Sequence, residues 1–464
     1  MVGRRVPPPA DLVLTLKDLP PPPANPFYDR LNRVLDEVHF DAFAEDLCRP
    51  HYAEGVGRPS VPPGVYFRML FLGYFEGLDS QRLIAWRCAD SRSMQAFLGL
   101  PPHETTPDHS SLTKIRQRLP QSIHEQVFAF VLKLAKDKGL VHGKTVGVDS
   151  TFLEANASLK TLVRREGGDD YKSYLRKLAA EAGIEDPSDE ELRRFDRKRP
   201  DKTLSNEDWM SPTDPASRIA RMKDHTTHLA YKAEHVVDLA SNVVLAARIY
   251  PADQSDMDTL VESVTTAQVN LIRAESEATL EAMAEEGAPI AAEGATIEEA
   301  VADKGYHKTE TLADCAALGV RTYIPEPDRP WQHVWSDKPA EWQQAYRANR
   351  RRLGGRRSKR LQRLRSEKVE RTFAHICETG RARRTWLRGL ITIGKRYLMQ
   401  VAARNLGIIL RAVFGRGTPR SLQGARSSLA MYLYRVFACG VDHGPSLSAA
   451  STSLRMRRCE FYVY

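Results

Sequence analysis

The chain has 464 residues, 42% of them hydrophobic and 27% charged, which is typical of a globular protein with two or three domains. Its six cysteines lie far apart without CxxC spacing, which argues against a zinc knuckle and against a secreted disulfide framework. The first residues lack the apolar core of a signal peptide, and the longest apolar run, near Val65 to Tyr74, is interrupted by Arg68. We therefore expect a soluble, cytoplasmic protein without a membrane partner, whose formal charge of +9 is unevenly spread.

The first third of the chain indicates a Pro-rich arm, residues 1–26, followed by an all-α domain, residues 27–140. Short amphipathic helices are expected near Val65 to Tyr74, after Ser80 and after Ser91. Asp108 then caps a basic helix. That helix carries Lys114, Arg116 and Arg118. The pattern is compatible with a DNA-binding helix-turn-helix-like module, and equally with an ordinary helical bundle that has a solvated basic face.

The central part of the chain indicates a mixed α/β sheet. A β-branched run from Thr145 predicts a buried strand that places Asp149 at an edge of the sheet. A polar helical insertion, about residues 155–225, precedes a hairpin of strands 229–238 and 243–250. Next come a helix at 257–285, a short strand into Asp303, a helix at 309–318 and a strand at 320–324. This order fits a mixed sheet with helices on its faces.

Basic residues are concentrated after residue 350. The densest run, residues 350–365, holds no acidic residue and leads into a helix predicted from Ser358 to Cys377, with Glu370 beside an apolar stripe. A second basic helix is expected to hold Arg381, Arg383, Arg384, Arg388, Lys395 and Arg396. The domain with the sheet is expected to span residues 141–412, and residues 413–464 form a carboxy-terminal tail.

Asp149, Asp303 and Glu370 are candidate metal ligands. Three acidic side chains brought together repel one another unless a cation neutralises them, and hard oxygen ligands suit Mg²⁺ or Mn²⁺. Two such ions can activate an attacking oxygen and stabilise a leaving oxygen in phosphoryl transfer. Each residue also has a simpler interpretation, because Asp303 could cap the turn at Gly305 and Glu370 could be a surface charge. His225, His228 and His235 are interpreted as hairpin and core residues.

The stretches around the three acids resemble the acidic motifs of bacterial insertion-sequence transposases with a DDE ribonuclease H-like domain. These stretches are Gly147 to Thr151, Ala302 to His307 and Glu370 to His375. Supporting stretches, among them His228 to Glu234, Pro251 to Gln254 and Arg384 to Gly389, also resemble that family. The similarity spans roughly residues 60 to 410. Part of the family has a Tyr, an Arg and a Lys around the Glu where this chain has Arg363, Ser366 and Cys377.

The resemblance implies a DNA transposase that cuts at the ends of its element and joins the freed 3′ hydroxyl to another site. It implies a ribonuclease H-like mixed sheet with flanking helices and a helical insertion, after an all-α domain. Asp149, Asp303 and Glu370 would hold Mg²⁺ or Mn²⁺, as two ions, with Lys304 and His307 as supporting contacts. The protein would be associated with the nucleoid and would act as a homodimer. Its partner would be double-stranded DNA, namely the terminal inverted repeats and the target. The residues expected to contact DNA are Lys114, Arg116, Arg118, Arg356, Arg357, Arg360, Arg363, Arg371, Arg384, Arg388 and Lys395.

Two other functions remain open at this stage. A ribonuclease H-like nuclease would cut without joining strands. A decayed or recruited transposase would be a non-enzymatic DNA-binding protein whose carboxylates are structural.

Overall fold

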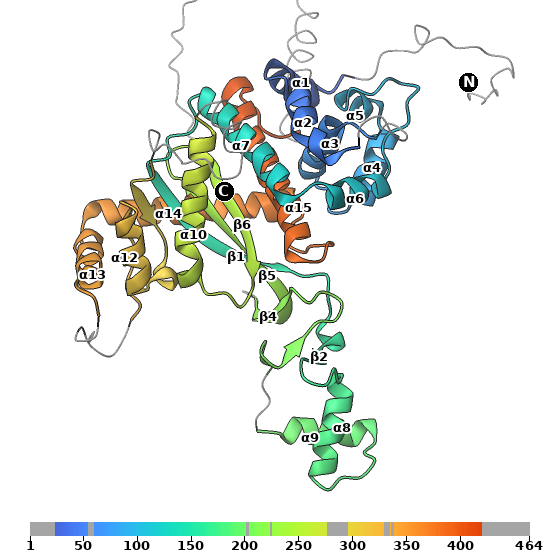
Figure 1. Ribbon diagram of the computed structural model, residues 1–464, viewed down its shortest axis with the longest axis vertical. Coiled ribbons are helices and arrows are strands. Elements are labelled where there is room, and N and C mark those ends of the chain that lie inside the picture. The colour runs from blue at the N-terminus through green and yellow to red at the C-terminus, as the bar shows by residue number, and fades with distance from the viewer. Residues whose placement is uncertain are drawn as a thin grey trace, which may run out of the picture. The chain divides into compact units, whose positions relative to one another are not determined.

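The computed structural model describes residues 24–53, 60–200, 204–222, 225–275, 296–328, 335 and 338–419 (Figure 1). Most of the Pro-rich arm, the end of the helix predicted at 257–285 and the tail from residue 420 lie outside these residues. The described residues fall within one compact unit that ends at Pro419.

The amino-terminal region is helical, as predicted, and side-chain caps define several of its helices. Ser80 Oγ accepts a hydrogen bond from Leu83 N, and Asp108 Oδ1 accepts one from Ser111 N at the start of the basic helix. The elements are α1 (Pro26–Glu37), α2 (Phe40–Cys48), η1 (Arg49–His51), α3 (Pro63–Phe75), α4 (Gln81–Asp90), α5 (Arg92–Phe97), α6 (His109–Arg118) and α7 (Gln121–Asp137).

The sheet is mixed, and its central strand is β1 (Thr145–Glu154). On one side β1 pairs antiparallel with β5 (Thr227–Asp238), which in turn pairs with β4 (Arg218–Arg221) and with β6 (Val244–Pro251). On the other side β1 pairs parallel with β7 (Glu299–Val301), and β7 pairs parallel with β8 (Arg321–Tyr323). The predicted hairpin is therefore confirmed, with Asn242 in the left-handed region at its turn.

Helices cover both faces of this sheet. Ser150 and its neighbour Asp149 point to opposite faces because side chains alternate along a strand. Ser150 contacts α10 (Asp256–Arg273), whereas Asp149 contacts α14 (Arg356–Ala374). The remaining elements are η3 (Lys304–Tyr306), α12 (Thr309–Ala317), α13 (Ala340–Leu353), the π-helical turn η4 (His375–Thr379) and α15 (Leu390–Phe414).

The long helix α15 joins the helical region to the sheet. It packs against α3 and α7 on one side and against β6 on the other. Its Asn405 side chain bridges the backbone N and O of Val244, at 3.1 and 2.9 Å. Helix α15, which follows the sheet in sequence, therefore connects the sheet to helices α3 and α7, which precede it.

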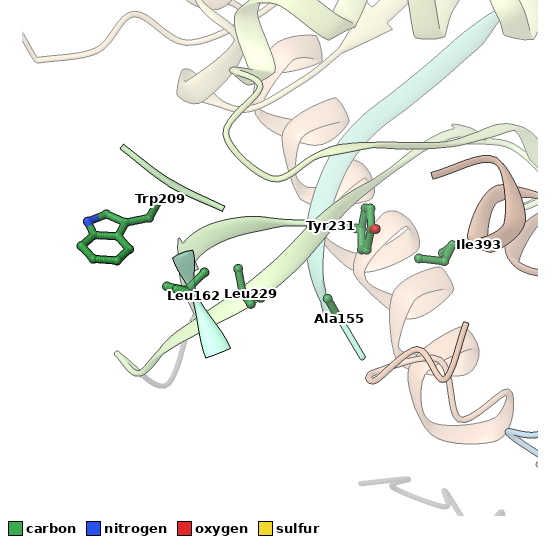
Figure 2. Packing of buried hydrophobic residues seen from close by; sticks show 6 residues of the cluster. All are labelled: Ala155, Leu162, Trp209, Leu229, Tyr231 and Ile393. Atoms are coloured by element: carbon green, nitrogen blue, oxygen red, sulfur yellow. The ribbon is translucent and has the colours of Figure 1, made fainter. Parts of the chain in front are cut away.

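The polar insertion forms its own small layer. It comprises η2 (Leu159–Thr161), β2 (Val163–Arg164), α8 (Tyr171–Glu181), α9 (Asp189–Lys198) and β3 (Trp209–Met210). Leu175, Ala179 and Leu192 pack together between its two helices. Figure 2 shows a second apolar cluster at its base, made by Ala155, Leu162, Trp209, Leu229, Tyr231 and Ile393. This cluster ties the insertion to β5 and to the first turns of α15.

Candidate active site

Asp149 lies in the middle of the central strand β1, not at a strand end at the edge of the sheet as predicted, and Asp303 follows the end of β7 at the same level. Gly147 of β1 is the register partner of Val301 of β7, and the two aspartates each stand two residues further along. Residues in register on parallel strands share a face, so both carboxylates belong to the face covered by α14. Burial is the main reason that the pKa of Asp149 is raised, and the negative charge of Asp303 adds to that effect.

The Asp149 carboxylate is largely buried and is held from two directions. Its Oδ1 accepts a hydrogen bond from Ser150 N at 2.8 Å, and its Oδ2 accepts one from Arg365 Nη1 of α14 at 2.7 Å. Burial raises the pKa of Asp149, and the positive charge of Arg365 opposes that effect. Arg365 thus occupies the position next to this carboxylate that a cation would take.

Asp303 begins the turn after β7. Its Oδ1 accepts a hydrogen bond from Gly305 N at 2.8 Å, so the simpler interpretation of this residue as a cap is confirmed. The close approach also explains the glycine, because a Cβ on Gly305 would lie 3.0 Å from Asp303 Oδ1 and 3.4 Å from Asp256 Oδ2. The cap uses one carboxylate oxygen, and Asp256 brings a further carboxylate to the same turn.

Glu370 lies on the same face of the sheet but on the solvent side of α14. Val369 packs on Gly147, and Lys368 Nζ donates to the carbonyl oxygens of Leu239 and Ala240, near the start of β1. Successive helix residues are about 100° apart, so Glu370 leaves α14 on the side opposite Lys368, toward the carboxyl end of β1. Its side chain is exposed and accepts a hydrogen bond from Ser366 Oγ at 3.1 Å.

The expected convergence of all three acids is not found. Within the described residues, no group of three or more His, Cys, Asp or Glu side chains is arranged to hold a metal ion. The oxygen chemistry of Asp149 and Asp303 nevertheless fits a hard divalent cation, and Arg365 neutralises Asp149 in this geometry. A cation at Asp149 would have to displace that guanidinium.

The opposite face of β1 holds a buried polar network that sequence analysis missed. Lys232 Nζ donates to Asp256 Oδ1 at 3.1 Å and to Thr259 Oγ1 at 3.0 Å, and Ser150 Oγ donates to the same Asp256 oxygen at 2.9 Å. Thr259 and Tyr306 both donate to Glu234 Oε2, at 2.8 and 2.9 Å. Lys232 and Glu234 stand in a stretch that resembles the family, but a lysine and a glutamate on an alternating strand indicate a solvated face.

His235 is a core residue, as interpreted, and His307 is buried too, so the expected role of His307 as a supporting contact stays a prediction. His235 is buried between Thr372 Oγ1, 2.7 Å from its Nδ1, and the Tyr397 hydroxyl, 2.8 Å from its Nε2. Burial lowers the pKa of His235 well below its usual value, so its imidazole is neutral. The His307 ring lies against Tyr346, whereas Lys304, the other expected supporting contact, is exposed beside Asp303.

The arginines of the basic run have two different roles. Three of them make structural contacts: Arg352 Nε donates to Thr322 O, Arg357 pairs with Glu299, and Arg365 pairs with Asp149. Others on α14 have exposed side chains, namely Arg356, Arg360, Arg363 and Arg371. The exposed set forms a cationic surface on the helix that covers Asp149.

The second basic helix was predicted too long. Residues 380–389 form a loop, and α15 begins only at Leu390. Gly389 adopts φ +80°, which ends any helical continuation there. Lys395 is buried, and its Nζ donates to the carbonyl oxygens of Arg116 and Leu119 at 3.0 and 2.7 Å, so it is not free to contact phosphate.

On the amino-terminal helix α6 the three expected DNA contacts differ in exposure. Lys114 and Arg118 are exposed, and the Arg118 guanidinium lies 4.6 Å from the centre of the Tyr52 ring. Arg116 is half-buried, and burial lowers its pKa. Lys114 and Arg118 are therefore the cations that α6 presents to solvent.

Comparison with known protein families finds two matches, both to families described as transposase domains. Residues 15–118 match a family described as transposase domain (DUF772), and residues 332–410 match a family described as transposase DDE domain. These matches confirm the resemblance to DDE transposases that the acidic motifs indicated. The DDE segment contains Glu370, whereas Asp149 and Asp303 lie outside both matched segments.

The other comparisons add little. No curated protein matches the chain. Among solved structures, a chain from the crystal structure of a pre-cleavage Mos1 transpososome aligns at 8% identity, covering 76% of this chain and 97% of that chain, with a TM-score of 0.18. A TM-score this low supports no conclusion about the fold. No helix in the described ranges is both long and apolar enough to cross a membrane.

Proposed function

We propose that this protein is a DNA transposase whose catalytic part is ribonuclease H-like. The observation that carries the proposal is the pair of aspartates at one level of two adjacent parallel strands, Asp149 within β1 and Asp303 just after β7, next to a helix with exposed arginines. The sequence matches to transposase families support the same function. The arrangement of an antiparallel hairpin on one side of β1 and two parallel strands on the other supports the ribonuclease H-like assignment.

In the proposed mechanism, the strand and the turn position the carboxylates before substrate binds. Ser150 N orients Asp149, Gly305 N orients Asp303, and the positive charge of Arg365 opposes the rise in the Asp149 pKa that burial causes. Mg²⁺ or Mn²⁺, as two ions, would be held by these two aspartates and by Glu370, and when bound would activate the attacking oxygen and stabilise the leaving oxygen. Glu370 is on the correct side of α14, and its exposed side chain can change rotamer toward the pair.

The exposed cations supply the proposed DNA surface. Phosphate contacts by Arg and Lys give affinity without sequence choice, and several exposed arginines lie on α14, the helix whose Arg365 contacts Asp149. The set comprises Arg356, Arg360, Arg363 and Arg371 on α14, Arg384 and Arg388 in the following loop, and Lys114 and Arg118 on α6. Terminal inverted repeats and a target would be the DNA partners, and a homodimer would bring two element ends together.

The test is strand cleavage and joining on DNA that carries the inverted repeats flanking this reading frame. Wild-type protein should cut at the repeat in Mn²⁺ and join a pre-cut 3′ hydroxyl to a target. Asp149→Asn should lose both reactions while retaining DNA binding. Asp258→Asn is the matched control, because Asp258 is exposed on neighbouring α10 and pairs with Lys308. Wild-type rates in Asp149→Asn would remove the assignment.

The alternatives make different predictions in the same assay. A nuclease would cut the repeat but leave pre-cut ends unjoined. A non-enzymatic DNA-binding protein is favoured by one observation, the Arg365–Asp149 ion pair, which satisfies the carboxylate without a metal. Such a protein would bind the repeat and neither cut nor join it. Calorimetric titration of the protein with Mg²⁺ at millimolar concentration would show no binding.

A further inference from the structure

The loop formed by residues 380–389 is bonded alongside the carboxyl end of β1. Glu154 N donates to Arg383 O at 2.9 Å, and Thr385 N donates back to Glu154 O at 2.8 Å. One residue further, Asn156 Nδ2 donates to Trp386 O at 3.0 Å. These contacts fix the backbone on both sides of Trp386 to the strand that carries Asp149.

The same loop is anchored from below. Leu387 packs against the apolar cluster that contains Tyr231 and Ile393 (Figure 2). Asp214 Oδ1, which is buried, accepts hydrogen bonds from Gly389 N at 3.1 Å and from the Tyr231 hydroxyl at 2.7 Å. The loop is therefore a rigid support.

Trp386 is nevertheless 48% exposed on this support, within a strongly cationic environment. The Arg384 guanidinium lies 5.2 Å from the centre of its ring. The Glu154 carboxylate lies 3.6 Å from Arg384 Nη1, and Asp79 lines the small cavity below the loop. The other side chains on this surface are the exposed Arg381, Arg383 and Arg388.

Ligand size limits where a partner could bind. The cavity beneath the loop holds only about 30 Å³, roughly the space of one water molecule. A planar ligand must therefore lie on the solvent-exposed part of Trp386, beside Arg384. A rigid exposed aromatic among arginines is the chemistry that stacks a nucleobase while holding its phosphates.

We propose that Trp386 stacks on an unpaired nucleobase of the DNA strand that is processed at Asp149. This inference rests on the proposed function and adds the substrate feature that the site recognises. Five residues of extended strand separate Asp149 from Glu154, roughly 17 Å. The stacked base would thus lie about five nucleotides from the phosphodiester at the carboxylates.

The experiment measures binding without divalent metal, so that it does not depend on cleavage. The probes are a fluorescein-labelled oligothymidine of about ten nucleotides, an abasic strand of the same length, a blunt duplex and a duplex with a short unpaired 3′ tail. Four proteins are compared: wild type, Trp386→Leu, Trp386→Phe and Ile391→Ala. Ile391 is the matched control because it is an exposed apolar residue, 59% exposed, on the adjacent first turn of α15.

We expect Trp386→Leu to weaken binding of oligothymidine and of the tailed duplex about tenfold, and to leave the abasic strand and the blunt duplex unchanged. Trp386→Phe should keep most of the affinity, and Ile391→Ala all of it. A loss on the tailed duplex alone would mean that the base is presented only from a duplex end, whereas a loss on both probes would mean that any unpaired strand is bound.

Two results would overturn the inference. One is equal affinity of wild type and Trp386→Leu for oligothymidine and the tailed duplex, and the other is an equal loss on the abasic strand. If wild type binds all four DNA probes but Trp386→Leu binds the probes with unpaired bases equally well, the proposed function still stands. If wild type binds none of them, the proposed function itself fails.

Discussion

The two faces of β1 show how neighbouring residues on one strand take different roles. Asp149 faces α14, where its carboxylate is contacted by one arginine and stands beside the solvent-accessible Asp303 turn. Ser150 faces α10, where hydrogen bonds connect it through Asp256, Lys232, Thr259 and Glu234 to Tyr306. On the first face one arginine neutralises Asp149, and a cation that binds there would have to displace it. On the second face, hydrogen bonds connect Lys232 through Thr259 to one oxygen of Glu234, while the other oxygen, Oε1, has no hydrogen-bond partner among the described residues.

The largest expected effect is on activity from the α14 face. Asp303→Asn should reduce strand cleavage about 10³-fold or more, because it removes a negative charge where several kcal/mol of metal stabilisation are proposed. Its stability should change by less than about 1 kcal/mol, since an Asn side chain can still accept the hydrogen bond from Gly305 N. Cleavage gels and urea denaturation measure the two effects. A large loss of stability with normal cleavage would reverse the roles of the two faces.

The next effect is on stability from the α10 face. Lys232→Met should destabilise the fold by about 3–5 kcal/mol, because Lys232 is 2% exposed and its removal leaves Asp256 and Glu234 without their cation. Lys304→Met, at an exposed lysine of the same edge, should change stability by less than about 0.5 kcal/mol. The comparison is between the denaturant midpoints of unfolding of the two variants, measured at constant m-value. Equal midpoints for both variants would mean that the network contributes no stability.

A smaller effect concerns pH. Burial raises the pKa of Asp149 and Arg365 lowers it, so Arg365→Gln should raise that pKa further. Because the ionised carboxylate is the reactive form in the proposed mechanism, activity is lost as pH falls through this pKa, and the loss should begin at higher pH in the variant. The ratio of cleavage rates at about pH 5 and about pH 8 should drop severalfold. Arg363→Gln, at an exposed arginine two residues earlier, should keep the wild-type profile.

The smallest effect is on non-specific DNA binding. Arg360→Ala should weaken duplex binding a few-fold and reduce the slope of log affinity against log salt by about 1, since Arg360 is exposed on α14. Lys395→Met should leave that slope unchanged, because the Lys395 ammonium group is buried and donates its hydrogen bonds to backbone carbonyl oxygens. Titrations at three salt concentrations measure both slopes. A slope change in Lys395→Met would mean that burial does not remove this lysine from the DNA surface.

Local sequence patterns predicted much of the fold. The alternation in residues 229–238 and 243–250 and the caps Ser80 and Asp108 correspond to observed elements. The segment after Gly380 was misinterpreted because its apolar spacing is helical, whereas backbone bonds to Glu154 hold it as a loop. Such bonds join residues more than two hundred positions apart, and no local pattern reports them. The domain boundaries at residues 26, 140 and 412 stay predictions.

The candidate site was predicted in part. The neighbourhood of Asp149 and Asp303 was predicted from two strands that were each expected to end in an acid. β1 instead continues to Glu154, and the parallel register of β1 and β7 brings the two residues to the same level. The position of Glu370 depends on the rotation of α14 about its axis, which Val369 and Lys368 set through packing and carbonyl contacts. Arg365 and Lys232 were missed because a charged residue is expected in solvent, and only tertiary contacts reveal that it neutralises a buried carboxylate.

The hydrogen bonds from Lys395 to α6 have a consequence for how such a protein would measure DNA. They join the helix that ends in Arg118 to α15, and Asn405 of α15 is bonded to β6 of the same sheet as Asp149. The DNA segment bound by α6 and the phosphodiester cut at Asp149 would then be separated by a fixed number of base pairs. Inserting about five base pairs between them would rotate the gripped groove to the far side of the duplex and put the cut out of reach.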